Sequence, residues 1–77
     1  MEYDYSLLRE TMRDERHSIR SLAKATDMHY GTLSGKLNNK SEFRVSEIIA
    51  IARELDISDV VRYFFTPKVR KTEQEKQ

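Results

Sequence analysis

The residues with the clearest potential for chemistry lie between His17 and Lys40, in the stretch HSIRSLAKATDMHYGTLSGKLNNK. Its second half places two glycines, Gly31 and Gly35, among small hydroxyl residues and one tyrosine, Tyr30. A glycine destabilises an exposed helix by about 1 kcal/mol relative to alanine, so two in one short segment require a reason. A slim helix face approaches a narrow partner closely and forms hydrogen bonds with it. The stretch therefore predicts recognition of a partner.

Catalytic and metal-binding chemistry find no support in the residue types. The chain has no cysteine, which excludes a thiolate nucleophile, a disulfide framework and a thiolate zinc site. It has no glycine-rich phosphate loop, and His17 and His29 lack the spacing of a metal-binding motif. A chain of 77 residues is one small domain with little room for an enclosed cleft. We expect no enzymatic activity, no metal and no cofactor.

Two short helical patterns position the recognition residues. Residues 18–25 carry apolar side chains at i, i+3 and i+4, which share one helix face. A tight connection follows, in which Asp27 tolerates left-handed backbone geometry and Met28 returns an apolar anchor to the core. In the second pattern Leu33 and Leu37 lie at i and i+4 on the buried side. One helix braced across another in this way predicts a helix-turn-helix, whose second helix enters the DNA major groove.

Three further helices complete an all-α, five-helix domain that we assign to residues 1–66. The apolar spacing predicts helices over 6–15 and 45–55, and a short fifth helix that ends before Pro67. The polar sequence of residues 67–77 predicts a disordered tail.

Individual residues carry more local predictions. The expected helix N-caps are Ser6, Ser18 and Ser58. The expected left-handed or glycine-like positions at helix ends are Asn39 and Asp56. Phe43 is expected to fill the core after the loop. Three consecutive aromatics, Tyr63 to Phe65, cannot all point inward from one helix, so at least one is available for a dimer or partner contact.

Charge is unevenly distributed although the net charge is only +1. Residues 17–44 hold five Lys or Arg against two acids, whereas residues 1–16 and 45–65 are net acidic. A small domain with one DNA-facing side shows this pattern.

The chain has no apolar run of transmembrane length and no signal-peptide pattern at its start, so we expect a protein of the bacterial cytoplasm that does not associate with a membrane.

Blocks spread over Tyr3 to Val69, namely YDYSLL, TLSGKLNNK, SEIIAIARELDIS and YFFTPKV, resemble those of small phage Cro-like regulators. The order of features from Ser18 to Asn39 is also similar to the five-helix DNA-binding domain of phage repressors of the lambda type. The resemblance implies a phage or prophage transcription regulator that binds operator DNA, commonly as a homodimer on paired half-sites. Two positions depart from the pattern: Ile19 replaces a glutamine that braces the first recognition residue, and Asn39 replaces a glycine.

The resemblance also implies roles by position. Tyr30 falls at the first base-reading position, Gly31, Ser34 and Gly35 at later groove-facing positions, and Asn38 at a phosphate contact. Thr32 falls where the side chain often faces partly inward. The residues that we expect at the DNA are Ser18, Arg20, Ser21, His29, Tyr30, Gly31, Thr32, Ser34, Gly35, Lys36, Asn38 and Lys40.

Simpler interpretations remain open for several of them. Tyr30 would otherwise cover the seam between the two helices, and the glycines would be neutral. Lys36 and Lys40 would otherwise be ordinary solvated lysines, and His29 caps the second helix or touches DNA. The expected function is repression by operator occupancy. The alternatives are a module that binds a partner repressor protein, and an antitoxin, for which the polar tail is short.

Overall fold

The computed structural model describes residues 2–69, and it is entirely helical in that part of the chain, with no strand. The five helices are α1 (Ser6–Asp14), α2 (Ile19–Ala25), α3 (Tyr30–Leu37), α4 (Val45–Leu55) and α5 (Val60–Phe64). These bounds agree with the expected all-α, five-helix organisation within one or two residues. None of the described helices has both the length and the apolar character needed to cross a membrane.

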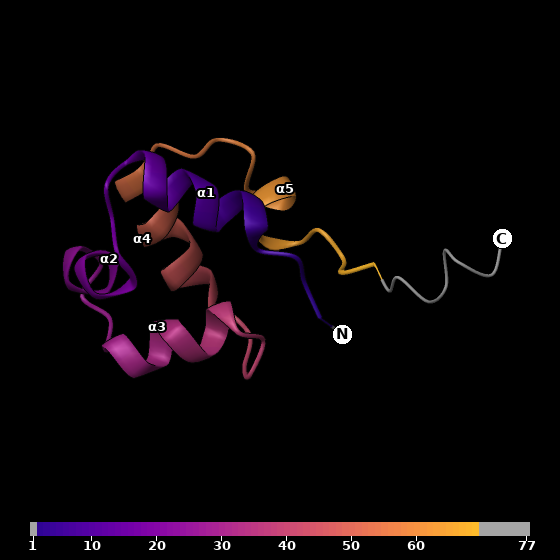
Figure 1. Cartoon of the computed structure of the whole chain (residues 1–77), viewed down its shortest axis with the longest axis horizontal. Coiled ribbons are helices and arrows are strands. Elements are labelled where there is room, and N and C mark those ends of the chain that lie inside the picture. Colours follow the sequence, from indigo (N-terminus) through magenta and orange to yellow (C-terminus); the bar gives the residue numbers. More distant parts are fainter. Residues whose placement is uncertain (1, 70–77) are drawn as a thin grey trace, which may run out of the picture.

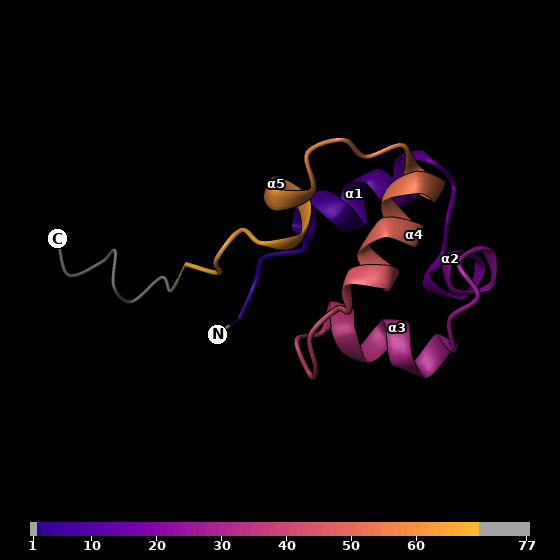
Figure 2. The same ribbon diagram turned by 180° about the vertical axis from the view of Figure 1, so that it is seen from behind.

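The helices surround α4, which contacts α2 and α5 (Figure 1). Helix α1 packs against α5 on one side, while α2 and α3 pack against each other on the other side. Figures 1 and 2 both show α3 along an outer edge, on the far side of α4 from α1 and α5. One face of α3 is therefore available to a partner.

The core lies where the apolar stripes of all five helices meet. Five side chains in it are fully buried: Leu8, Leu22, Leu33, Ile51 and Phe64. Burying a leucine, isoleucine or phenylalanine side chain stabilises the fold by about 1.5–3 kcal/mol, so these contacts dominate the packing energy.

Aromatic rings close the end of the core next to the α3–α4 loop. The ring of Phe43 meets the rings of Tyr5 and Phe64 edge-on, with centroids 5.4 and 5.3 Å apart. Phe43 therefore fills the core after the loop, as the sequence indicated. Of the three consecutive aromatics, Phe64 is buried, Tyr63 is half-buried and Phe65 is exposed, which confirms that they do not all point inward.

Two of the three predicted serine caps are wrong. The N-cap of α1 is Tyr5, and Ser6 is the first helical residue; its backbone N–H donates to Asp4 Oδ1 at 2.9 Å, and its hydroxyl donates to the same carboxylate. Helix α5 is capped by Asp59, whose carboxylate accepts from the Arg62 N–H at 3.1 Å, and Ser58 lies one residue too early. In both cases a carboxylate within two positions of the serine replaces its hydroxyl, because an anion also interacts favourably with the helix dipole.

Residues with left-handed backbone geometry lie where the sequence predicted them. Asp27, Asn39 and Asp56 have φ angles of 58°, 62° and 57°. Arg16 also has a positive φ, 62°, which the sequence did not indicate. Its backbone N–H still donates to the Arg13 carbonyl at 2.9 Å, which closes the end of α1.

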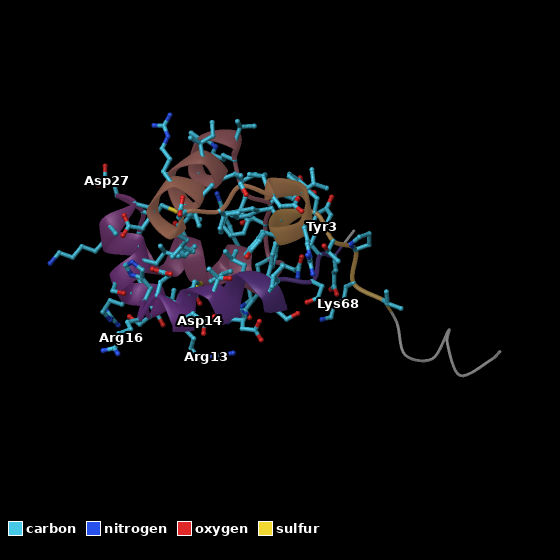
Figure 3. The ribbon with its side chains drawn as sticks, turned by 90° about the horizontal axis from the view of Figure 1, so that it is seen from above. Tyr3, Arg13, Asp14, Arg16, Asp27 and Lys68 are labelled. Carbon is cyan, nitrogen blue, oxygen red and sulfur yellow. The ribbon has the colours of Figure 1, made fainter. Side chains whose placement is uncertain are left out.

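The two terminal segments pair with each other. The Asp4 N–H donates to the Thr66 carbonyl at 2.7 Å, and the Lys68 N–H donates to the Glu2 carbonyl at 3.0 Å. Figure 3 shows Tyr3 and Lys68 close together at this end of the molecule. The pairing brings Pro67 and Lys68 alongside the N-terminal segment. Residues 70–77 of the predicted disordered tail lie outside the described residues.

Candidate nucleic-acid interface

The α2–α3 pair forms a rigid unit because its connection is short and anchored. The Met28 N–H donates to the Ala23 carbonyl at 2.7 Å, and the half-buried Met28 side chain packs on the core. Leu33 and Leu37 turn one side of α3 inward. This geometry fixes the opposite side of α3 relative to α2.

The outward side of α3 is nearly free of large side chains. Gly31 and Gly35 lie one helical turn apart on it, together with Thr32 and the half-buried Ser34. Thr32 is exposed, so it does not face inward as the resemblance had left open.

The fold itself does not require these glycines. Neither has a positive φ. A Cβ atom at Gly31 would lie 3.6 Å from His29 Nδ1, and one at Gly35 would lie 3.9 Å from the Lys40 Cβ, which are ordinary contacts. Alanine would fit at both positions and would stabilise the helix, so neither the backbone nor the packing explains the glycines.

Tyr30 begins α3 and is stacked by a residue of α2. The Cζ atom of Arg20 lies 4.5 Å from the centroid of the Tyr30 ring. The tyrosine remains 43% exposed. The aromatic therefore does not lie buried in the seam, and the two side chains form one exposed pair across the first turns of α2 and α3.

Lys36 is not placed as expected. Its side chain is 10% exposed, and its Nζ donates to Glu47 Oε1 of α4 at 2.6 Å. A lysine in this position is neither solvated nor presented to a phosphate. The Lys36 side chain points inward because α4 supplies a carboxylate partner. The sequence of α3 alone does not indicate that partner.

The Glu47 carboxylate serves both α3 and α4. Burial by itself would raise its pKa, but the hydrogen bonds from Lys36 and from the Arg44 N–H, with the charges of both residues, hold the pKa below the ordinary value. The ion pair thus attaches the last turn of the candidate recognition helix to the first turn of α4.

Cations and amides surround the C-terminal end of α3. Lys40, whose Cβ lies next to Gly35, is exposed. Asn38 is also exposed, and its Nδ2 donates to the Ser34 carbonyl at 2.9 Å. Arg9 of α1 donates to the Leu37 carbonyl and to Asn38 Oδ1, both at 3.2 Å. This end of α3 therefore carries one exposed cation, Lys40, and an amide that a second cation, Arg9, holds in place.

Three of the predicted contact residues are helix caps. Ser18 and Ser21 cap α2 reciprocally, each hydroxyl accepting from the other residue's N–H at 3.0 Å. His29 caps α3 by accepting from the Gly31 N–H at 3.3 Å, as one of its two interpretations proposed. The Ser21 hydroxyl is also 2.9 Å from Nδ1 of His17, whose Nε2 is 3.1 Å from Glu54. The three capping residues, Ser18, Ser21 and His29, stay exposed at the surface but also hold the helix ends.

Asn39 ties the loop after α3 to the N-terminal segment. Its Oδ1 accepts from the Tyr3 N–H and its Nδ2 donates to the Tyr3 carbonyl, both at 2.9 Å. A glycine would adopt the same left-handed φ but could not make these bonds. These two bonds give a structural reason for an asparagine at position 39, where the lambda-type pattern has a glycine.

Within residues 2–69, His, Cys, Asp and Glu side chains form no group of three or more that would hold a metal ion.

The family model for proteins of unknown function designated DUF739 matches residues 1–67. The chain belongs to the DUF739 family. The match covers all five helices and the paired terminal segments. A search of curated proteins finds no match to this chain.

In this DUF739 member, the sequence alone missed three contacts of the candidate interface. They are the stack of Arg20 on Tyr30, the bonds of Arg9 to the end of α3, and the pairing of Asn39 with Tyr3. Each joins residues from different elements, and no periodic pattern within one element reports such contacts. The ion pair of Lys36 with Glu47, which also joins two helices, was missed for the same reason.

Proposed function

We propose that this protein is a sequence-specific, double-stranded DNA-binding transcription regulator of a phage or prophage, which acts by occupying its operator. One observation carries the proposal: the outward side of α3 keeps two glycines that have room for a side chain. A close approach of the α3 backbone to a partner accounts for them. The major groove admits a helix at this distance and offers hydrogen-bonding groups to Thr32 and Ser34.

The charges around α3 support the same partner. Arg20 lies at one end of the outward face and Lys40 at the other, and Arg44 lies beside His29 and Thr32; all three cations are exposed. In the proposed complex they contact phosphates or base edges, and the Asn38 amide adds a neutral donor. Every phosphate neutralised contributes about −0.9 to the slope of log K against log salt, so binding weakens steeply as salt rises.

The arrangement of α2 and α3 fits a helix-turn-helix domain of the lambda repressor type, and the sequence blocks resemble Cro-like regulators. Domains of this kind bind paired half-sites about 34 Å apart as dimers. We propose a homodimer on DNA, with Val61 of α5 and Phe65 just after it, 69% and 43% exposed, as candidate contacts between the copies. The host cytoplasm is then its location.

The test is selection from a random duplex library followed by anisotropy titration at two salt concentrations. The selected duplex is expected to bind at least ~1,000-fold more tightly than a scrambled duplex, and to be palindromic. Tyr30→Ala combined with Ser34→Ala abolishes this preference, whereas Ser58→Ala, which removes an exposed hydroxyl outside α3, retains it. If no sequence is enriched and only weak salt-sensitive binding remains, the proposal fails.

A second function is favoured by the apolar side chains on α4 and α5. Ile49 is 45% exposed, and Val61 and Phe65 are exposed as well. These residues suit a module that binds a partner repressor protein instead of DNA. Under this alternative Val61→Ser abolishes capture of the partner repressor, and the Tyr30 and Ser34 double variant leaves capture intact.

A further inference from the structure

The stacked pair of Arg20 and Tyr30 has features that a simple brace does not need. The guanidinium lies over the ring face, with Cζ 4.5 Å from the centroid. Both side chains are exposed, and both sit in the first turn of their helices. The ring restricts the rotamers of a long side chain without covering it.

The stack leaves the hydrogen-bonding edge of the guanidinium uncommitted. A cation–π contact uses the charge of the guanidinium, and the five N–H donors of its planar fork are not all occupied by one ring. Within residues 2–69, the Arg20 side chain forms no hydrogen bond and no ion pair. The Tyr30 ring thus positions the N–H donors of Arg20, and those donors have no acceptor within the described residues.

The position of the fork decides which group it meets. Tyr30 is the first residue of α3, so a guanidinium over its ring lies at the N-terminal end of that helix. On the proposed function, on which this inference rests, that end of α3 lies at the base edges. The in-plane fork of arginine matches the O6 and N7 acceptors of guanine in the major groove.

We propose that Arg20 reads a guanine in each half-site, and that Tyr30 is the platform that positions its guanidinium. Arg20 belongs to α2, so the base-reading surface extends beyond the recognition helix. This assigns a task to α2 at the position next to Ile19, which cannot form the polar brace typical of lambda-type domains.

The experiment compares base preference at every position of the selected duplex for the wild type, Arg20→Ala and Lys24→Ala. Lys24 is the matched control, because it is an exposed cation on the same helix without an aromatic partner. Arg20→Ala is expected to lose about 5- to 150-fold in affinity for the selected duplex and to lose the guanine preference at one position of the half-site. Lys24→Ala is expected to keep the full preference at that position.

Replacing that guanine by 7-deazaguanine, which lacks the N7 acceptor, tests the contact directly. The replacement is expected to weaken binding of the wild type and to have no effect on Arg20→Ala, since the two changes remove the same interaction. Tyr30→Phe keeps the ring and the guanine preference, and Tyr30→Leu reduces the preference.

Two results would overturn the inference while leaving the proposed function in place. In one, Arg20→Ala weakens selected and scrambled duplexes equally and lowers the salt slope by about 1, which identifies a phosphate contact. In the other, the 7-deazaguanine effect persists at full size in Arg20→Ala. A library selection that enriches no duplex refutes the proposed function and this inference together.

Discussion

Replacing both glycines of α3 by alanine is predicted to strengthen the fold and weaken DNA binding. Gly31→Ala and Gly35→Ala each place a methyl group where the nearest atoms are 3.6 and 3.9 Å away, so no strain opposes the change in the free protein. Alanine is favoured over glycine by up to about 1 kcal/mol in a helix interior. Both positions lie within two residues of a helix end, where the effect is smaller.

We therefore expect about 0.5 kcal/mol of added stability from each substitution and about 1 kcal/mol from both. For a domain of this size, that corresponds to a rise in Tm of about 4–8 °C. In the complex the same methyl groups lie between the α3 backbone and the groove. Overpacking of this kind costs about 1–3 kcal/mol, which is a loss of about 5- to 150-fold in affinity.

Thermal unfolding by circular dichroism and anisotropy titration of the selected duplex measure the two effects on the same samples. Glu10→Ala, on the exposed side of α1, is the control for a helix-stabilising change away from α3. The opposite signs are decisive, because a variant that is more stable cannot lose binding by unfolding. A lower Tm would show that the fold requires the glycines, and unchanged affinity would show that this side of α3 does not meet DNA.

Three further predictions concern stability alone. Glu47→Gln leaves Lys36 buried without a counter-charge and is expected to lower the free energy of unfolding by about 2 kcal/mol at pH 7, measured by urea unfolding. Because the fold lowers the pKa of Glu47, the stability that its carboxylate contributes is present above about pH 4.5 and is lost as the pH falls below that value. Asn39→Gly keeps the left-handed φ but loses both bonds to Tyr3, so we expect a loss of about 1–2 kcal/mol, and Asn39→Ala loses about 1 kcal/mol more. Asp56→Gly relieves a left-handed non-glycine residue at the end of α4 and is expected to raise the unfolding free energy by about 0.5–1 kcal/mol.

Contrary results have a definite meaning in each case. Equal pH dependence of the wild type and Glu47→Gln below pH 4.5 would mean that the ion pair does not stabilise the fold. If Asn39→Gly matched the wild type, the bonds to Tyr3 would contribute nothing. A less stable Asp56→Gly would show that the aspartate does more at the helix end than adopt its φ.

Much of the fold follows from local patterns. Apolar residues at helical spacing indicated the first four helices, an apolar cluster ending before Pro67 indicated the fifth, and the short polar residues Asp27 and Asn39 indicated left-handed turns. These signals act within a few residues, where backbone sterics and amphipathicity decide the conformation. Two of the three serine caps were wrong for a related reason: at the start of α1 and of α5 a carboxylate, Asp4 or Asp59, accepts from a backbone N–H in place of the serine hydroxyl.

The candidate site was less predictable than the fold. Helical spacing placed the glycines on the outward side of α3, but it also placed Lys36 there. The lysine turned inward because Glu47 lies across from it on α4, and that proximity depends on how two helices pack. The stack of Arg20 on Tyr30 depends in the same way on the angle between α2 and α3.

The pairing of the two terminal segments bears on how the chain folds and opens. Nearly the whole described chain lies between the hydrogen-bonded partners Asp4 and Thr66, so forming this bond requires closing a very long loop. Helical contacts of short sequence separation form first, and long-range closure follows late. The same pairing is exposed at the molecular edge and is therefore expected to open in local fluctuations before the core does. Because Asn39 bonds to Tyr3 within it, each such opening also releases the loop that follows α3, and the dynamics of the chain ends reach the candidate recognition helix.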